Sequence, residues 1–323
     1  MVLSPKGKQK FRPHRTASKM GAKTKPDTLS ASRAGTSGPS SKVGIPVARD
    51  VETLRAYTRA WRQKGETIGL IPTMGALHDG HLSLVRAALR DCDRVVATIF
   101  VNPTQFAPTE DFTSYPRDEA DDIAKLDRLS ADLLFAPDVT QMYAEDSSTK
   151  VVVSEISEGL CGKTRPHFFS GVATVVTKLF LQSLADRAYF GEKDYQQLQV
   201  VRRMVRDLDI PIEITGVPTV REKDGLAMSS RNWYLTPEER AIAPVLHQTL
   251  QATAAAARDG DTCASAIEMG KKTLSEAGFA QIDYLEICDA DTLVPLTRAD
   301  RPARVLVAAM LGKTRLIDNV PVL

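Results

Sequence analysis

Apolar positions change period repeatedly after residue 45, from helical spacing to short apolar runs and back. Positions 51, 54, 57, 60 and 61 are apolar at helical spacing, with Asp50 before them as a helix cap and Gly65 after them as a stop. Strand-like runs follow at residues 67–71, 95–101, 133–135 and 188–190, and helical periodicity follows at residues 80–91, 118–129, 172–184 and 195–208. Strands that alternate with helices predict an α/β fold with a doubly wound parallel sheet.

The pattern changes beyond residue 219. Helical periodicity extends over residues 237–258 and 264–277, and strand-like runs follow at residues 282–287 and 305–310. Helices followed by strands favour a separate α+β domain. We therefore expect an α/β domain over residues 45–219 and a smaller α+β domain over residues 220–323, and a length of 323 residues fits two domains.

Residues 1–44 differ from the rest of the chain in composition. They contain ten lysines and arginines and one acid, Asp27, so this segment carries +9, and the remainder of a chain of net charge +2 carries −7. A segment with almost no large apolar side chains cannot bury enough surface to offset its ordering entropy, which predicts a disordered basic tail. Two other interpretations stay open, a targeting peptide and an arm that contacts nucleic acid.

The acidic remainder of the chain argues against a dedicated nucleic-acid binder, in which basic residues line a folded face. No apolar run approaches the roughly 20 residues that span a bilayer, and the N-terminus lacks an apolar signal region. The four cysteines, at positions 92, 161, 263 and 288, form no C-x-x-C pair, and a chain of this length needs no disulfides. These features predict a cytoplasmic protein with neither a membrane nor a nucleic-acid partner.

The loop after the first long strand contains two histidines. It reads PTMGALHDGH and places His78 and His81 three residues apart where a strand gives way to a helix. One helical turn points both imidazoles the same way, and a helix N-terminus favours anions, so the pair would bind a triphosphate. Capping or space-filling roles and a zinc site remain alternatives, although no second cluster of His or Cys completes a zinc site.

One motif imitates a phosphate-binding P-loop. Gly162-Lys163-Thr164 follows an apolar run at residues 151–153, but the pattern needs a glycine where the chain has Ser157. Pro166 also interrupts the helix that should begin at the lysine. No G-x-G-x-x-G follows a predicted strand, so the sequence argues against a P-loop kinase and a dinucleotide dehydrogenase.

Three further polar loops carry candidate binding groups. The amides of FVNPTQF, residues 100–106, would bind a hydroxyl or a carboxylate, although Asn-Pro is also an ordinary turn. FGEKDYQQL, residues 190–198, offers a lysine for phosphate and an aspartate for ribose, although a charged helix start is more often only solvated. DGLAMSSRN, residues 224–232, has two hydroxyls and an arginine that suit a polyphosphate. Ligands bind beyond the carboxyl ends of parallel strands, so the loops after residues 71, 101 and 190 should converge.

The histidine-containing loop and these three polar loops, in this order and spacing, resemble the pantothenate synthetase (pantoate-β-alanine ligase) family of the nucleotidyltransferase superfamily. The likeness extends over residues 45–323. The resemblance implies a Rossmann-like core with a C-terminal α+β lid, in a homodimer that uses ATP and Mg²⁺. It implies the condensation of (R)-pantoate with β-alanine through a pantoyl adenylate. The products would be AMP, pyrophosphate and pantothenate, a precursor of coenzyme A.

The resemblance also implies roles for individual residues. His81 would be the proton donor, and the other catalytic residues would be His78, Lys193 and Arg231. Pantoate and β-alanine would be bound by Gln105, Gln197 and Asn102, and Asp121 would lie near Mg²⁺. The ATP site would comprise Met74, Gly75, Ala76, Leu77, His78, Asp79, Gly80, His81, Gly191, Glu192, Lys193, Asp194, Val220, Met228, Ser229, Ser230 and Arg231.

The chain departs from the family pattern at one motif. The family typically reads R-P-x-H-F-x-G-V, and the position of the expected histidine is occupied by Phe168. Either His167 supplies an imidazole from the neighbouring position or the contact is dispensable. Neither residue is therefore assigned to the site.

Two other classes of function remain alternatives. A related nucleotidyltransferase, with a dinucleotide or nucleoside-diphosphate product, would share the histidine pair and phosphate loops but have no use for Gln105 and Gln197. An RNA-associated role of the basic tail would leave the lysine, histidines and arginine of the predicted site unexplained.

Overall fold

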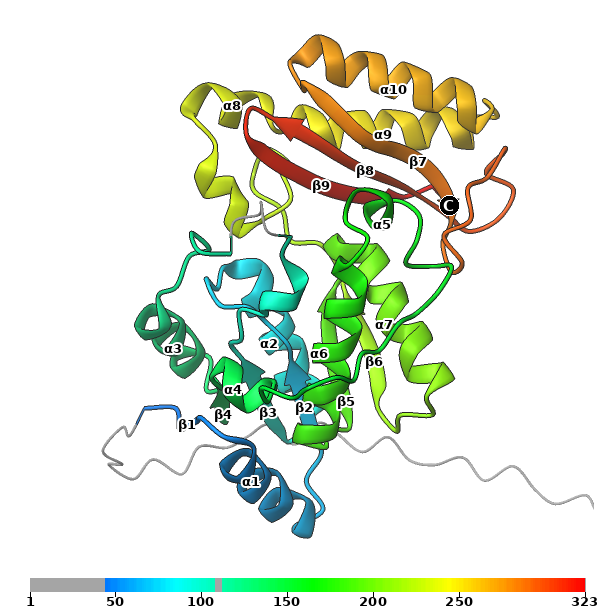
Figure 1. The fold of residues 1–323 in the computed structure, drawn as a ribbon. Helices are drawn as coiled ribbons and strands as arrows, with labels where there is room; N and C mark the ends of the chain where they lie inside the picture. Colours follow the sequence, from blue (N-terminus) through cyan, green and yellow to red (C-terminus); the bar gives the residue numbers. More distant parts are fainter. Residues whose placement is uncertain (1–43, 108–111, 323) are drawn as a thin grey trace, which may run out of the picture. The chain divides into compact units, whose positions relative to one another are not determined.

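The computed structural model of the chain describes residues 44–107 and 112–322. The predicted basic tail, residues 1–44, lies outside them apart from Gly44. The described residues belong to one unit, Val43–Leu323, which contains two β-sheets (Figure 1).

Six parallel strands form the larger sheet, in the order β1-β4-β3-β2-β5-β6. They are β1 (Val47–Ala48), β2 (Ile68–Ile71), β3 (Arg94–Thr98), β4 (Leu133–Phe135), β5 (Arg187–Gly191) and β6 (Glu213–Val217). The helices between them are α1 (Val51–Gln63), α2 (Asp79–Asp91), α3 (Glu119–Arg128), α4 (Val139–Met142), α5 (Cys161–Thr164), α6 (Phe168–Ser183) and α7 (Tyr195–Asp207). The predicted α/β fold with a doubly wound parallel sheet is confirmed.

The strand order reverses direction at β2. From β2 the chain proceeds outward through β3 to β4, and it then returns to β5 on the other side of β2 before it reaches β6. Connections that leave adjacent strands in opposite directions open a crevice at the carboxyl ends of those strands. The loops after β2 and β5 therefore flank this crevice.

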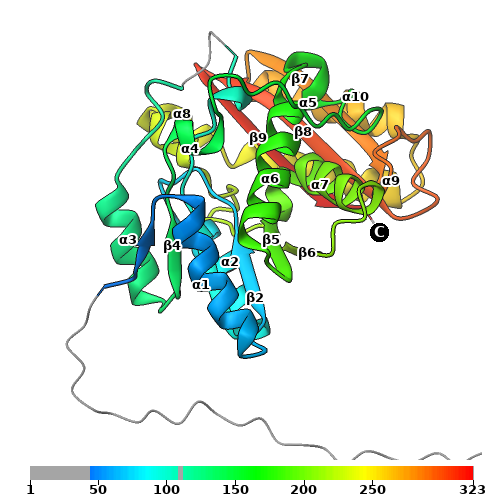
Figure 2. The ribbon, with the colours of Figure 1, turned by 60° about the horizontal axis from the view of Figure 1, so that its bottom comes forward.

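Helices cover both faces of the parallel sheet, because successive residues of a strand point to opposite sides. Leu133 and Phe135 of β4 belong to a core shared with α1, α6 and α7, whereas Leu134 belongs to a second core shared with α2 and α3. Helices α1 and α6 lie side by side in both views (Figures 1 and 2). Burial on both faces explains why these strands are continuous apolar runs in the sequence.

The smaller sheet has three antiparallel strands, in the order β7-β8-β9. Its strands and neighbouring helices are β7 (Gln281–Asp289), β8 (Ala303–Leu311), β9 (Thr314–Pro321), α8 (Pro237–Ile242), α9 (Val245–Arg258) and α10 (Cys263–Ala277). Helices α9 and α10 pack on this sheet and share a core with it (Figure 1). Leu306 of β8 and Tyr284 of β7 also contact the core of the larger sheet, so the domain boundary at residue 219 stays a prediction.

Several boundaries differ from those predicted. The two-residue strand β1 and the strand β6 at the opposite edge were missed, and the strand predicted over residues 95–101 ends at Thr98. Strand β9 was missed because Asp318 and Asn319 are polar yet buried, which conceals its alternation. The helix predicted over residues 237–258 is divided at Pro244, which lacks the backbone N–H that a continuous helix needs.

The glycine of the motif that imitates a P-loop has a packing role. Residues 151–153 form no strand, and Gly162 lies in the one-turn helix α5. A Cβ atom at Gly162 would lie 1.8 Å from the carbonyl oxygen of Ser157, so the glycine permits the close approach of two backbone segments. The structure agrees with the argument against a P-loop.

Gly162→Ala should lower the free energy of unfolding by about 1–3 kcal/mol, because an added methyl group must displace the Ser157 backbone. Gly159→Ala is the matched control, since a Cβ atom at Gly159 meets nothing within 4 Å. Urea unfolding of both variants provides the measurement. Equal stabilities would contradict the packing role of Gly162.

Candidate active site

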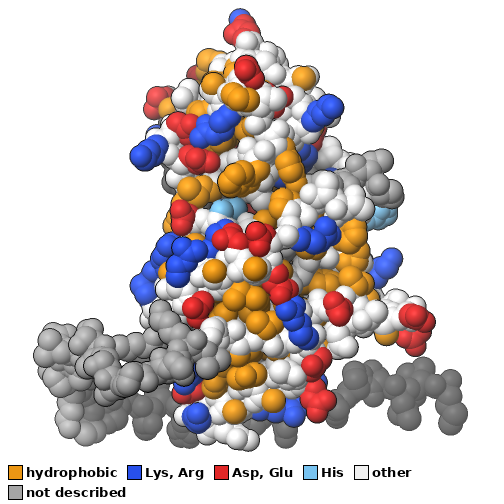
Figure 3. All heavy atoms as spheres, turned by 90° about the vertical axis from the view of Figure 1, so that its left-hand side faces the viewer, with side chains coloured by type: hydrophobic (Ala, Val, Ile, Leu, Met, Phe, Trp, Pro, Cys, Tyr) orange, Lys and Arg blue, Asp and Glu red, His pale blue; other side chains and the backbone are white. Residues whose placement is uncertain are grey.

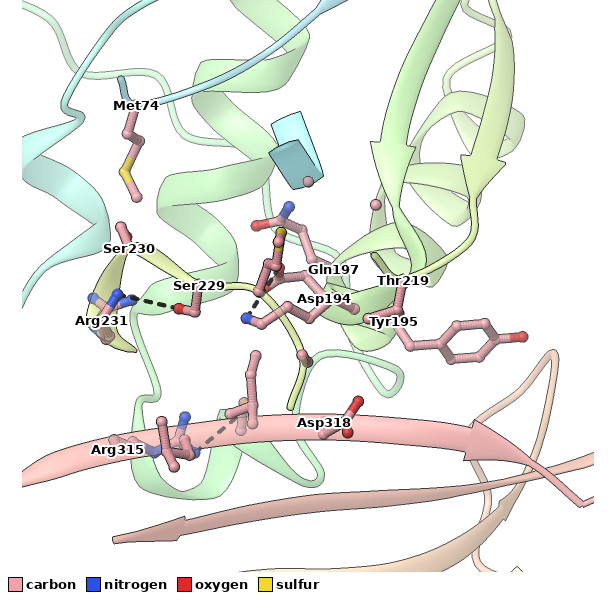
Figure 4. A pocket seen from close by; sticks show the side chains of 18 of the residues that line it. Met74, Asp194, Tyr195, Gln197, Thr219, Ser229, Ser230, Arg231, Arg315 and Asp318 are labelled. Atoms are coloured by element: carbon pink, nitrogen blue, oxygen red, sulfur yellow. Dashed lines mark hydrogen bonds and ion pairs between the residues drawn. The ribbon is translucent and has the colours of Figure 1, made fainter. Parts of the chain in front are cut away.

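A cavity of about 590 Å³ lies between the carboxyl ends of β2 and β5 and the strand β9 (Figure 4). Its volume is typical of a small-molecule site. The cavity is lined by these residues of the predicted site: Met74, His78, Gly80, His81, Gln105, Gly191, Lys193, Asp194, Gln197, Val220, Met228, Ser229, Ser230 and Arg231. Residues from the loops after residues 71, 101 and 190 all line this cavity, so the predicted convergence of these loops is confirmed.

The two histidines cap the helix that they begin. The Nδ1 atom of His78 accepts the backbone N–H of Gly80 at 3.1 Å, and the Nδ1 atom of His81 accepts the backbone N–H of His78 at 3.4 Å. The two rings lie 4.1 Å apart between centroids. A Cβ atom at Gly80 would lie 2.8 Å from the His78 ring, so glycine is needed between them. The capping alternative is thus correct, and it is compatible with a binding role.

These hydrogen bonds determine which ring nitrogen carries the proton. Because Nδ1 of each imidazole accepts a hydrogen bond, the proton of the neutral ring lies on Nε2. Burial, followed by the nearby Lys193 ammonium, lowers the pKa of His78 to about 4. Burial, followed by His78, lowers the pKa of His81 to about 3. Each histidine therefore presents a neutral Nε2–H donor at pH 7.

The turn after β5 brings a cation to the same cavity. Residues Glu192–Asp194 form a 3₁₀ turn, and the Lys193 side chain is only 18% exposed. Its ammonium lies 3.9 Å from the carboxylate of Asp194, which also lines the cavity (Figure 4). Glu192 does not line the cavity, because its carboxylate accepts a hydrogen bond from Arg304.

The segment from Val220 to Arg231 forms another wall. The Met228 N–H donates to the Val220 carbonyl at 3.0 Å, which, with the antiparallel bridge between Arg221 and Ala227, pairs the two arms of this loop. The Ser229 hydroxyl then accepts the Arg231 N–H at 3.2 Å, which begins a 3₁₀ turn. The Ser230 hydroxyl lies 3.5 Å from that of Tyr115. Hydroxyls and a guanidinium thus occupy one turn beside the cavity (Figure 4).

Three glutamines, Gln105, Gln196 and Gln197, line the cavity, and the Asn102 amide lies behind Gln105. Asn102 is fully buried, and its Nδ2 group donates to the Gln105 Oε1 at 2.9 Å. Its Oδ1 accepts hydrogen bonds from the hydroxyls of Thr104 and Tyr143. Asn102 therefore orients Gln105, whereas Gln105 and Gln197 line the cavity themselves.

Several predicted residues do not line the cavity: Gly75, Ala76, Leu77, Asp79, Asn102, Asp121 and Glu192. The Asp121 carboxylate is half exposed and forms an ion pair with Lys125 at 2.6 Å, so its place near Mg²⁺ stays a prediction. Within residues 44–107 and 112–322, no group of three or more His, Cys, Asp or Glu side chains that could hold a metal ion is found.

The neighbouring Asp122 has a role that sequence reasoning missed. This side chain is buried, and its two oxygens accept the backbone N–H groups of Ala76 at 2.9 Å and Leu77 at 2.7 Å. Lys125 donates to the Leu77 carbonyl at 2.6 Å. Helix α3 thus holds the loop that leads to the histidines. The signal was the spacing of four residues between Asp122 and the buried Leu126, which places both on one helical face.

At the motif that departs from the family pattern, Phe168 lines the cavity and His167 does not. His167 is exposed, so the idea that it supplies an imidazole to the site is wrong. The Arg165 guanidinium lies 3.8 Å from the centroid of the Phe168 ring and donates to the Gln105 carbonyl at 3.0 Å. Phe168 therefore supports a cation at the edge of the cavity.

Charge is mixed on the face of the molecule shown in Figure 3, where Lys and Arg side chains alternate with Asp and Glu and hydrophobic side chains form separate patches. Among the described residues, no helix has the length and apolar character needed to cross a bilayer.

The parallel sheet, its switch point and the cations and imidazoles beyond it define an α/β enzyme with an anion-binding site. The family model described as pantoate-β-alanine ligase matches residues 46–321. The pantothenate synthetase of Paramagnetospirillum magneticum is 58% identical over 278 residues, which cover 86% of this chain and 98% of that protein. The pantothenate synthetase of Caulobacter vibrioides is 57% identical over 279 residues, which cover 85% and 98%. The chain belongs to the pantoate-β-alanine ligase family and is an amide-forming ligase.

Solved structures agree with this family. Pantothenate synthetase from Thermus thermophilus superposes with a TM-score of 0.81 at 49% identity, covering 86% of this chain and 99% of that one. Pantoate-β-alanine ligase from Francisella tularensis, complexed with βγ-ATP and β-alanine, has a TM-score of 0.74 at 34% identity, covering 86% and 98%.

The histidine pair should remain neutral well below the usual pKa of histidine. Unfolded imidazoles bind protons near pH 6.5, whereas those of His78 and His81 bind them at about 4 and 3. The unfolded state thus holds more protons in this window, so stability falls as the pH decreases from 6.5 towards 3. Imidazole NMR resonances should show no midpoint above pH 5 for either residue, with His81→Gln used for assignment. A midpoint near 6.5 would contradict the burial of the pair.

The exposed His167 and the cavity-lining Phe168 should differ in their effects on activity. His167→Ala should change kcat/KM by less than about two-fold, as expected for a surface residue. Phe168→Ala removes the ring beneath Arg165, and a cation–π contact of about 0.5–2 kcal/mol corresponds to a loss of about 2- to 30-fold. Steady-state kinetics of both variants decide the matter, and a larger loss for His167→Ala would reverse the assignment.

Proposed function

We propose that the cavity performs the ATP-dependent condensation of (R)-pantoate with β-alanine through a pantoyl adenylate. The observation that carries the proposal is the convergence of two neutral imidazoles, Lys193 and Arg231 with the amides of Gln105 and Gln197 around one cavity. Cations and N–H donors suit the phosphates of ATP, and the amides suit the hydroxyl and carboxylate groups of pantoate.

In the first step, a carboxylate oxygen of pantoate attacks the α-phosphorus of ATP. A new P–O bond forms, the bond to the β-phosphate oxygen breaks, and pyrophosphate leaves. Two anions must approach each other, so positive groups have to lie where the charge develops. Lys193 and Arg231 supply the charge, and the Nε2–H groups of His78 and His81 donate hydrogen bonds.

Neutral imidazoles are suited to this step as hydrogen-bond donors. With pKa values of about 4 and 3, His78 and His81 carry no positive charge at pH 7 and hold no proton in excess. The role expected for His81 from the resemblance, that of a proton donor, is therefore better described as hydrogen-bond donation through Nε2–H. A neutral donor already aligned with the phosphate needs no reorganisation during the reaction.

Pantoate would lie against the two glutamines. Asn102 occupies the Oε1 side of the Gln105 amide, which orients the Nε2 group of Gln105 away from Asn102. An oriented amide can donate to a carboxylate or accept from a hydroxyl with little loss of side-chain entropy. In the second step, the neutral β-alanine amine attacks the acyl carbon, the C–N bond forms and the nitrogen releases one proton to solvent. The acyl C–O bond breaks, and AMP leaves with the former carboxylate oxygen.

Several finer features belong to the same proposal. Val220 would contact adenine through its backbone, and residues 220–323 would form a lid that excludes water from the hydrolysable adenylate. Mg²⁺ is usually held by substrate phosphates and a few carboxylates, and Asp121, paired with Lys125, would lie near it. A homodimer in the cytoplasm completes the proposal.

Incubation with ATP, pantoate and β-alanine tests the function directly. The expected products are AMP, pyrophosphate and pantothenate in equal amounts. Release of ADP, or of a stable dinucleotide without pantothenate, would contradict the ligase and favour another nucleotidyltransferase reaction.

Lys193→Ala and His81→Ala should each slow pantoate-dependent exchange between ATP and pyrophosphate by about 10²- to 10³-fold, the usual cost of removing one aligned donor. The exchange is measured without β-alanine. Preformed pantoyl adenylate should partly bypass the defect, because the phosphate step is then already complete.

Lys163→Ala is the matched control for the lysine, since Lys163 is exposed and does not line the cavity. Its exchange rate should equal that of the unaltered enzyme. Normal exchange by Lys193→Ala would place the phosphate site elsewhere. An unaltered enzyme that exchanges only with β-alanine present would argue against a free adenylate.

A further inference from the structure

Strand β9 of the smaller sheet forms part of the cavity wall through two buried polar residues, Asp318 and Asn319. Each is 3% exposed. A buried polar side chain must be hydrogen-bonded to be tolerated, so the partners of these two residues indicate what they do.

Asn319 is hydrogen-bonded to the turn that contains Lys193. Its Nδ2 group donates to two successive backbone carbonyls, those of Glu192 and Lys193, each at 2.9 Å. Both hydrogens of one amide are thus used on one turn. One of these carbonyls belongs to Lys193, whose ammonium faces the cavity. A change at Asn319 should therefore alter the position of the backbone from which that ammonium extends.

The orientation of the Asn319 amide is determined by a neighbouring arginine. Arg304 Nη1 donates to Asn319 Oδ1 at 2.5 Å, and Arg304 Nη2 donates to the Glu192 carboxylate at 3.2 Å. The Arg304 guanidinium also lies 3.9 Å from the centroid of the Tyr195 ring. With its oxygen held by Arg304, Asn319 must point its donor group at the 192–193 turn.

The adjacent Asp318 contacts the segment from Val220 to Arg231, the other wall that faces the nucleotide in the proposed function. Its carboxylate accepts two hydrogen bonds from Arg221, at 2.6 and 3.0 Å, and Arg221 also donates to the Gly225 carbonyl at 3.1 Å. Residues 221 and 227 form a β-bridge that precedes Met228. One strand therefore reaches both segments that face the nucleotide in the proposed function.

We propose that Asn319 is a positioning residue for adenylate formation, which holds the Glu192–Asp194 turn so that the Lys193 ammonium is aimed at the phosphates of ATP. The inference rests on the proposed role of Lys193. It assigns to the smaller sheet a direct part in the first chemical step, in addition to covering the site.

The first test uses Asn319→Ala and Asn319→Asp. Both remove the donor to the turn, and aspartate keeps the size of the side chain and its contact with Arg304, so it serves if the alanine variant folds poorly. Exchange between ATP and pyrophosphate should fall about 10- to 100-fold, because a misplacement of about 1 Å can cost 10²-fold. Aminolysis of preformed pantoyl adenylate and the KM for pantoate should change by less than about threefold, since the amide pair is untouched.

A double-mutant cycle separates positioning from general stability. If Asn319 acts through Lys193, then Asn319→Ala should slow exchange by no more than about twofold in a chain that already carries Lys193→Ala, because residues acting as one unit are not additive. Gln281→Ala is the control, since it removes an exposed amide on β7 that does not line the cavity. That variant should exchange at the unaltered rate.

The outcomes are distinct. If Lys193→Ala slows exchange but the Asn319 variants exchange normally, only the positioning role is overturned. The same holds if the losses of exchange in the two single variants multiply in the double variant. Normal exchange by Lys193→Ala overturns the proposed role of Lys193 and this inference with it. Equal losses of exchange and aminolysis in the Asn319 variants also overturn it, since they indicate general damage to the site.

Discussion

The cavity depends on one constraint, which is that the buried polar backbone groups of its loops must be hydrogen-bonded. Buried polar residues from neighbouring elements meet this constraint. Asp122 of α3 binds the N–H groups of the loop after β2, and Asn319 of β9 binds the carbonyls of the turn after β5. Gln196 of α7 does the same for the segment before α5, at Ile156, Gly159 and Cys161. His78 and His81 satisfy backbone N–H groups through Nδ1, which leaves Nε2–H of each ring available to a ligand.

The electrostatics of the cavity follow from the same arrangement. Burial and the nearby ammonium disfavour a charged imidazole, so the histidines beside Lys193 stay neutral. A positive histidine would repel Lys193 and would have to lose its charge before it could occupy the same small site. The neutral imidazoles add hydrogen-bond donors without adding to the positive charge of a cavity that is also lined by Arg165, Lys193, Arg231, Lys313 and Arg315.

The sequence was sufficient to predict the α/β fold, and most of the predicted site residues line the cavity, because helical and strand periodicities and four loop motifs depend on local order. The supporting residues were less accessible. Asp122 was not predicted, although a signal for its burial was present in the spacing to Leu126. No local signal identified Asn319, because two adjacent polar residues such as Asp318 and Asn319 are typical of a turn. The backbone groups to which Asn319 donates also lie 126 and 127 residues away in the sequence. Likewise, the substitution at Phe168 could be interpreted only once Arg165 was seen above its ring.

The distance in sequence between Asn319 and the turn that it holds has a consequence for synthesis on the ribosome. The six strands of the parallel sheet are complete when residue 217 has been made, and their cores can begin to form then, since chains fold from the N-terminal side as they emerge. The Lys193 turn nevertheless lacks its buried partner until about a hundred more residues have been translated. At roughly 5–20 residues per second this interval lasts several seconds. A nascent chain would therefore carry a folded sheet before the Lys193 turn gained the hydrogen bonds of Asn319.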